Sequence, residues 1–326
     1  MSDIMLEKYI KSQRKRFIVS RILKSIPIIL LATFIAFMMM RIGSVDPAEM
    51  HLGRHATEEM IQNFNEKYGL DEPLHLQYIH WLEGLFHGNL GRSIRYDTPI
   101  SELVAQRIGI SVQLMGLAIL ISVVFGILSG VISALYHNTL VDYLITIQAL
   151  VWRSFPDFFL GILLMLVFAY YLGVLPIGGY EGPAYLILPA FAMGLRMQAI
   201  IARLTRSSML SVLNKDYIKT AKTKGLSKNM VIFKHALRNA LIPVVTIIAM
   251  RLPWMFGGAM VTEQVFNIPG MGRLILEGAL SRDFILVQST VLLITILAVF
   301  GNLLADVAYT YVDPRIDIMG ASNEVK

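Results

Sequence analysis

The sequence holds few residues whose type and spacing suit catalysis or metal binding. His51 and His55 are four residues apart, the spacing of a metal-binding pair on one helix face. Gly53 between them weakens such a helix, so we interpret the pair as polar surface and expect no metal site. The chain has no cysteine and lacks the motifs G-x-x-x-x-G-K-S/T, H-E-x-x-H and G-x-S-x-G. We therefore predict a protein that is not an enzyme, with no catalytic residue and no cofactor of its own.

Ionisable residues inside long apolar runs are the other candidates, because a charge at membrane depth is costly and usually faces a cavity or a partner. Arg153 and Asp157 are four residues apart and could pair across one helical turn, with Pro156 as a kink between them. Each charge also has a structural interpretation, as an ion pair or as a side chain that reaches the membrane interface. The residues that we consider for a translocation path are Arg153, Asp157, Met250, Arg251, Trp254 and Glu263.

These charges lie in apolar runs that are too long for a soluble core. The chain has 326 residues, of which 55% are hydrophobic and 16% charged. A helix needs roughly 20 apolar residues to cross the hydrocarbon. Six continuous runs satisfy this length: residues 22–40, 108–135, 140–175, 185–204, 237–261 and 284–309. We predict an all-α integral membrane protein with six transmembrane helices.

Lysine and arginine cluster before the first run and between the fourth and fifth runs. The positive-inside rule places both regions, and with an even number of spans both termini, in the cytoplasm. The loop after the first run is acidic, so the net charge of +6 does not indicate nucleic-acid binding. The expected segments are a basic cytoplasmic segment (1–21), the first transmembrane helix (22–40), an extracytoplasmic loop (41–107), a core of five helices (108–316) that includes a cytoplasmic loop (205–236), and a cytoplasmic tail (317–326).

Two amphipathic helices are expected in the extracytoplasmic loop. Thr57 begins the first, and Gly69 ends it. The second presents one apolar face and is typical of a helix that lies on the outer membrane surface. The residues on that face are Tyr78, Trp81, Leu82, Leu85 and Phe86.

The basic segment 214–243 has the sequence NKDYIKTAKTKGLSKNMVIFKHALRNALIP. Its spacing predicts a helix from Asp216 to Lys224, a turn at Gly225, and a second helix at 228–239. The small side chain of Ala221 would let another protein approach closely, whereas the lysines could pair with acidic groups or anionic lipid headgroups. From the residues alone, a partner-binding segment and a basic loop lying on the membrane are equally compatible with this pattern.

This segment resembles the coupling loop of ABC importer permeases, in which Glu-Ala-Ala precedes three residues, a Gly and a later Leu-Pro. Ala221 and Gly225 occupy matching places, whereas Lys219 and Thr220 replace the Glu and the first Ala. The forms Y-I-x-T-A-x-x-K-G-L at 217–226 and H-A-L-R-N-A-L-I-P at 235–243 are similar to the oligopeptide, dipeptide and nickel branch. The likeness extends to residues 68–74 (YGLDEPL), 263–272 (EQVFNIPGMG) and 302–316 (NLLADVAYTYVDPRI), and it indicates a B-type subunit.

The resemblance implies a type I ABC importer transmembrane fold in the cell membrane, surrounded by lipid, with a homologous C-type permease enclosing the other half of the path. It implies two cytoplasmic ATPase subunits, which bind ATP and Mg, and no nucleic-acid partner. An extracytoplasmic solute-binding protein would dock on the outer loop and near 266–273, and the cargo would be a dipeptide, an oligopeptide or a nickel chelate. The residues implied in ATPase coupling are Asp216, Tyr217, Thr220, Ala221, Lys222, Lys224, Gly225 and Leu226.

Two alternatives of other classes stay open at this point. An ion-coupled secondary transporter would need carboxylates deep in the membrane, for which Asp157 and Asp306 are the candidates. A membrane receptor or scaffold would bind a ligand through residues 41–107 and signal through the basic loop, without moving cargo. Dependence of uptake on ATP separates the first alternative from an ABC importer, and accumulation of labelled solute inside vesicles separates the second.

Overall fold

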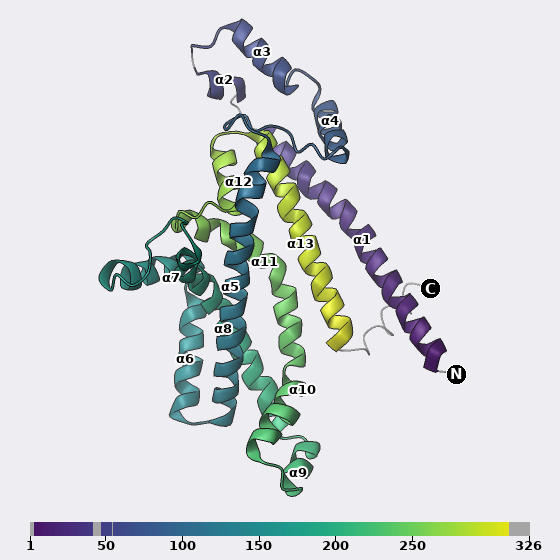
Figure 1. The fold of residues 1–326 in the computed structure, drawn as a ribbon, viewed down its shortest axis with the longest axis vertical. Helices are drawn as coiled ribbons and strands as arrows, with labels where there is room; N and C mark the ends of the chain where they lie inside the picture. The colour runs from purple at the N-terminus through teal and green to yellow at the C-terminus, as the bar shows by residue number, and fades with distance from the viewer. Residues whose placement is uncertain (1–2, 42–46, 54, 313–326) are drawn as a thin grey trace. The chain divides into compact units, whose positions relative to one another are not determined.

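The computed structural model describes residues 3–41, 47–53 and 55–312, and most of these residues are helical (Figure 1). Within these ranges the only strand-like pairing is an isolated bridge between Arg92 and Pro99, so the all-α prediction is confirmed. The elements are α1 (Asp3–Arg41), α2 (Pro47–Leu52), α3 (Glu58–Tyr68), α4 (Leu74–Phe86), α5 (Ile100–Leu135), α6 (Leu140–Ser154), α7 (Asp157–Leu164), η1 (Met165–Tyr171), η2 (Pro183–Leu186), α8 (Ile187–Leu213), α9 (Asp216–Thr223), η3 (Met230–Leu237), α10 (Arg238–Ala240), α11 (Ile242–Val265), α12 (Met271–Leu280) and α13 (Phe284–Val312).

Four helices in the described part of the chain are long and apolar enough to cross a membrane: Val19–Arg41, Ile100–Leu135, Pro183–Leu213 and Phe284–Leu303. Two further helix pairs pass the same test but are bent, Leu140–Ser154 with Asp157–Tyr171 and Met230–Ala240 with Ile242–Ile248. If each bent pair is one span, the count reaches the six that the sequence predicts. The predicted assignment of segments to the two sides of the membrane stays a prediction, and the tail at 317–326 lies outside the described residues.

The run at 140–175 is not one straight helix, which corrects the sequence prediction. The chain bends by 108° between the two halves of this run, α6 and the α7–η1 segment. Phe155 and Pro156 both have extended backbone between the halves. Proline disfavours helical backbone in the residue before it, so the break falls at Phe155.

Two other boundaries differ from those that the sequence predicts. Helix α8 continues to Leu213, so the first part of the expected loop at 205–236 is helical. The fifth run does not begin as one helix at 237, because the chain bends by 47° between α10 and α11. Pro243 lies in the first turn of α11, where its missing N–H leaves no unsatisfied partner.

The chain divides into two compact units. The first unit contains residues 112–268 and the described parts of 1–21 and 298–326. The second unit contains the described parts of residues 22–111 and residues 269–297.

Close backbone contact between α5 and α8 organises the first unit. Gly126 and Gly130 form a Gly-x-x-x-Gly pair on α5, the arrangement that lets membrane helices approach closely. A Cβ atom built on Gly130 would lie 2.6 Å from the carbonyl oxygen of Ala202 and 2.5 Å from Cβ of Thr205, both on α8. A Cβ on Gly126 would lie 2.7 Å from Cβ of Ile201. The two backbones are therefore in contact at both glycines.

We expect Gly130→Ala to destabilise the protein, because the added methyl group meets backbone that cannot move aside. Overpacking of this kind costs about 1–3 kcal/mol, which a thermal unfolding curve of the detergent-purified chain resolves. The matched control is Gly116→Ala on the same helix, where a Cβ meets no atom within 4 Å. Equal unfolding midpoints for the two variants would contradict the α5–α8 contact.

The outer-loop helices lie in the second unit and largely match the sequence predictions. Thr57 accepts a hydrogen bond from the Met60 amide at the start of α3, and Gly69 ends this helix in left-handed backbone. On α4, the Tyr78 hydroxyl donates to the Leu30 carbonyl of α1 at 3.1 Å, and the Trp81 indole donates to Ser289 of α13 at 3.2 Å. This helix face therefore contacts the chain itself, and its place on the membrane surface stays a prediction. Phe86 is 89% exposed and does not share in these contacts.

Candidate functional site

The basic segment 214–243 has the predicted helix–turn–helix form. Helix α9 is followed by Lys224 and then by Gly225, whose φ of +76° lies in the left-handed region. The Gly225 amide donates to the Lys222 carbonyl at 3.0 Å, and the Leu226 amide donates to the Ala221 carbonyl at 3.4 Å. The second helix consists of a π-helical stretch, η3, and the short α10. The turn at Gly225 therefore separates α9 from the second helix.

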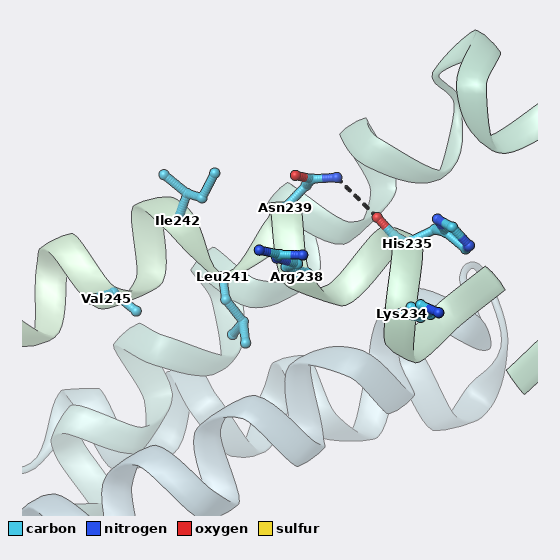
Figure 2. Close-up of a pocket in the computed structure, with 7 residues that line it drawn as sticks. All are labelled: Lys234, His235, Arg238, Asn239, Leu241, Ile242 and Val245. Atoms are coloured by element: carbon cyan, nitrogen blue, oxygen red, sulfur yellow. Dashed lines mark hydrogen bonds between the residues drawn. The ribbon is translucent and has the colours of Figure 1, made fainter. Parts of the chain in front are cut away.

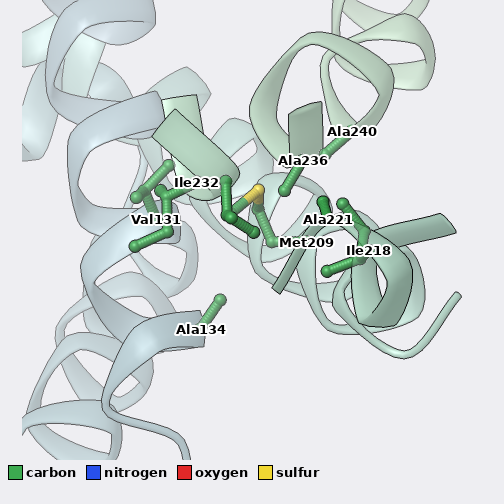
Figure 3. Packing of buried hydrophobic residues seen from close by; sticks show 9 residues of the cluster. Val131, Ala134, Met209, Ile218, Ala221, Ile232, Ala236 and Ala240 are labelled. Carbon is green, nitrogen blue, oxygen red and sulfur yellow. The ribbon is translucent and has the colours of Figure 1, made fainter. Parts of the chain in front are cut away.

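One face of α9 is buried against its own chain (Figure 3). Ile218 is fully buried and Ala221 is 7% exposed. They belong to a cluster with residues of α5, α8, η3 and α10, namely Val131, Ala134, Met209, Val231, Ile232, Ala236 and Ala240. Ala221 thus faces inward, which corrects the expectation that its small side chain lets another protein approach. What its size permits is close packing between α9 and the helices of the same unit.

The opposite face of α9 is exposed and carries only weak interactions. Lys219 forms an ion pair with Asp216 at 2.9 Å, and both side chains are mostly exposed. Tyr217 accepts a hydrogen bond from Asn239 at 3.1 Å, which links α9 to α10. The other predicted coupling residues divide into those that are exposed, Thr220, Lys222, Lys224 and Gly225, and the partly buried Leu226, which packs against the cluster. An exposed ion pair of this kind contributes at most about 1 kcal/mol.

A buried polar cluster lies where the α5–α6 turn meets α8, and no local sequence pattern predicts it. Arg206 donates to both carboxylate oxygens of Asp142 at 2.7 Å, and the Asp142 side chain is only 3% exposed. The same carboxylate accepts from the Ser133 hydroxyl and, at 3.0 Å, from the Asn138 amide. His137 lies 3.1 Å from it and 3.0 Å from Arg206. Asp142 therefore joins α5, the turn and α8, the helix that leads into α9.

Replacing Asp142 by Asn should strongly destabilise the first unit, because it leaves the partly buried Arg206 without its counter-charge. Breaking a buried pair in this way costs about 3–5 kcal/mol. The measurement is the unfolding midpoint of the purified variant. Asp216→Asn, which removes an exposed pair with the same loss of charge, should cost less than about 1 kcal/mol. Equal unfolding midpoints for the two variants would show that the Asp142–Arg206 pair does not stabilise the folded protein more than an exposed pair does.

The six residues considered for a path do not form one cluster. Asp157 lies 3.7 Å from Arg196 of α8, so its partner is not Arg153, and the predicted pair across one helical turn is wrong. The break at Phe155 and Pro156 separates those two residues. Met250, at 59% exposure, and Arg251 are exposed on α11.

The remaining path candidates are Glu263 and Trp254. Glu263 is fully buried and does not line an open surface in this conformation. The side chains of Trp254 and Asp306 lie outside those that the structure describes. Helices α7, α8 and α11 contact one another, so Asp157, Arg196 and Arg251 lie on mutually packed helices. A role of these residues in a path stays a prediction.

The expected docking segment near 266–273 is largely buried. Phe266 and Ile268 are at most 1% exposed, and Met271 is 2% exposed. The Phe266 carbonyl accepts a hydrogen bond from the Gly179 amide at 2.8 Å, and a Cβ on Gly178 would lie 2.6 Å from that oxygen. This segment therefore contributes mainly to packing, and Asn267 is its exposed residue.

A second polar cluster, also missed from the sequence, centres on Glu277 of α12 in the second unit. Its carboxylate accepts from the Tyr96 hydroxyl at 2.7 Å, from Arg107 at 2.9 Å and from Arg273 at 2.8 Å. Burial disfavours the charged form, but the hydrogen bonds from Tyr96 and Arg107 and the nearby positive charges outweigh it, so the pKa of Glu277 is lowered. Nearby, Asp283 accepts from Ser93 and from the Leu286 amide at the start of α13.

The lowered pKa of Glu277 predicts a pH-dependent contribution to stability. A carboxylate whose pKa is lower in the folded state stabilises the protein above its ordinary pKa of 4.5, and this contribution is lost as the pH falls through the folded value. The difference in unfolding free energy between wild type and Glu277→Gln should therefore be large at pH 7 and shrink below about pH 4.5. Glu83→Gln, at an exposed position on α4, is the control. A difference that is independent of pH would contradict this prediction.

Comparison with known proteins gives family matches that together run from residue 14 to residue 318. Residues 109–318 match the family described as binding-protein-dependent transport system inner membrane component, and residues 14–115 match the corresponding N-terminal family. The chain belongs to this family of transport-system membrane components. It is a multi-pass membrane permease, and the predicted placement in the B-type oligopeptide and dipeptide branch is confirmed by the relatives that follow.

Relatives of the permease align over nearly their full length. The oligopeptide transport system permease protein AppB of Bacillus subtilis is 38% identical over 312 residues, which cover 92% of this chain and 99% of the relative. The glutathione transport system permease protein GsiC of Salmonella typhimurium is 36% identical over 300 residues, covering 92% and 98%. The dipeptide transport system permease protein DppB of Alkalihalophilus pseudofirmus is 36% identical over 324 residues, covering 91% and 97%.

Solved structures support the fold of this permease. An inward-facing form of the MetNI methionine ABC transporter gives a TM-score of 0.54 at 16% identity, covering 65% of this chain and 96% of the other. An amino acid ABC transporter gives a TM-score of 0.51 at 14% identity, covering 65% and 94%. The type I ABC importer transmembrane fold is therefore confirmed.

Proposed function

We propose that this chain is the permease subunit of an ATP-driven importer of dipeptides, oligopeptides or a related small solute such as a nickel chelate. The observation that carries this proposal is the full-length alignment with permeases of oligopeptides, dipeptides and glutathione. The chain would form one half of the translocation path, and a homologous C-type permease would form the other. An extracytoplasmic solute-binding protein would deliver the cargo.

The energy would come from two separate ATPase subunits that bind ATP and Mg, and α9 would be the part of the permease that contacts one of them. The geometry of α9 supports this role in two ways. Its inner face, with Ile218 and Ala221, is held by the cluster of its own unit. Its outer face, with Tyr217, Lys222 and Lys224, is exposed, and neither of these lysines forms an ion pair with any residue that the structure describes. A movement imposed on the outer face would therefore pass to α5, α8 and α10.

The first test measures uptake of a labelled peptide into proteoliposomes that contain the assembled complex. Uptake should require ATP inside the vesicles and the solute-binding protein outside. Uptake that persists without ATP and follows a proton gradient would instead favour a secondary transporter. Binding of peptide without accumulation would favour a receptor.

The second test is Gly225→Glu, which should leave the subunit in the membrane but abolish uptake. The left-handed backbone at Gly225 strains any other residue, while a Cβ there meets no atom within 4 Å, so the turn changes without a clash in the core. Gly173→Glu is the matched control, because Gly173 has φ of +62° and equally open surroundings but lies outside the segment 214–243. Normal ATP-dependent uptake by Gly225→Glu, with normal assembly of the ATPase, would defeat the coupling assignment.

A further inference from the structure

An open groove lies where the second helix of the basic segment bends into α11 (Figure 2). Its volume is about 520 Å³, and its lining residues are Lys234, His235, Arg238, Asn239, Leu241, Ile242 and Val245. The bend of 47° between Met230–Ala240 and Ile242–Ile248 lies at the middle of this lining. The groove therefore lies at the junction between the helix that carries the cations and α11, near the start of the apolar run that the sequence predicts at 237–261.

The polar end of the groove carries cations with no acidic partner. Lys234 and Arg238 are one helical turn apart and exposed, and neither forms an ion pair with any residue that the structure describes. His235 lies beside them. The amide of Asn239 is already used, since its nitrogen donates to the His235 carbonyl at 3.0 Å and to Tyr217 at 3.1 Å. Two charges that have no ion-pair partner among the described residues therefore face the groove.

The other end of the groove is apolar and lies further along the same span. Leu241, Ile242 and Val245 follow the cations in sequence, and Ile242 is 38% exposed. Where α11 enters the membrane at its first turn, the cations just before it lie at the level of the lipid headgroups, and the apolar residues that follow lie at the level of the acyl chains. The order of groups along the groove thus matches the order of groups in a phospholipid.

We propose that this groove binds an anionic phospholipid, with the headgroup phosphate between Lys234 and Arg238 and an acyl chain along Ile242 and Val245. A free phosphate ion would use the cations but gain nothing from the apolar wall. An acidic protein segment would also use the cations, but every charged group that it places against the apolar wall costs free energy. A phospholipid satisfies both ends of the groove, so we favour it over either.

Native mass spectrometry of the full-length chain tests this site with two probes, phosphatidylglycerol and phosphatidylcholine with the same acyl chains. Phosphatidylglycerol should bind more tightly, and the variant Lys234→Gln/Arg238→Gln should bind it about ten- to thirtyfold more weakly. The matched control is Lys228→Gln/Arg203→Gln, which removes the same two charge types from exposed positions outside the groove. The charge-conserving variant Lys234→Arg/Arg238→Lys should bind like wild type. Unfolding midpoints of all the variants show whether each is folded.

Several outcomes would overturn the proposal. They are equal affinity for the two lipids, equal weakening by the groove variant and its control, and displacement of the lipid by inorganic phosphate at the same concentration. A photo-crosslinking residue at position 242, introduced in cells, distinguishes the remaining occupants. A lipid adduct supports the site, whereas adducts with protein alone would show that another chain covers the groove.

Discussion

The buried ion pair between Asp142 and Arg206 is the constraint on which the first unit depends. It holds the α5–α6 turn against α8 through two hydrogen bonds of 2.7 Å, and its burial makes any alternative arrangement of either charge costly. Contact at Gly126 and Gly130 fixes the separation of α5 and α8 along the same pair of helices. The ion pair joins the first turn of α6 to α8, and the Asp142 carboxylate also accepts a hydrogen bond from Ser133 of α5. Because α8 runs directly toward α9, the position of the exposed basic segment follows from these two contacts.

Much of the fold could be predicted from the sequence because the relevant signals are local. Apolar runs of sufficient length identify the spans. The ends of α3 follow from the hydroxyl of Thr57, which accepts a hydrogen bond three residues away, and from Gly69, which adopts left-handed backbone easily. The turn after α9 was predictable for the same reason, since left-handed backbone at Gly225 favours glycine. The break in the third run was underestimated. Pro156 indicated a kink within one helix, but its effect on the backbone of Phe155 ends the helix there, and the chain bends by 108°.

The parts that the sequence could not predict depend on contacts between distant residues. Periodicity shows that Ile218 and Ala221 share a face of α9, but it does not show whether that face contacts the chain or a partner. Asp142 has no unusual neighbours in sequence, and its partner Arg206 is 64 residues away. The partner of Asp157 was wrongly predicted for a related reason, because four-residue spacing implies contact only where the helix is continuous. In each case the contact depends on a residue that is distant in the sequence.

The two faces of α9 differ in how easily their interactions can be exchanged. Every apolar side chain of the inner face is committed to neighbours within the unit, so removing one leaves a cavity. On the outer face, Lys219 and Asp216 remain largely hydrated while paired, and separating them requires little desolvation or reorganisation. A protein that offers a new carboxylate to Lys219 or a new cation to Asp216 can therefore substitute one surface pair for another. The permease could attach and release such a partner repeatedly while the packing beneath α9 stays unchanged.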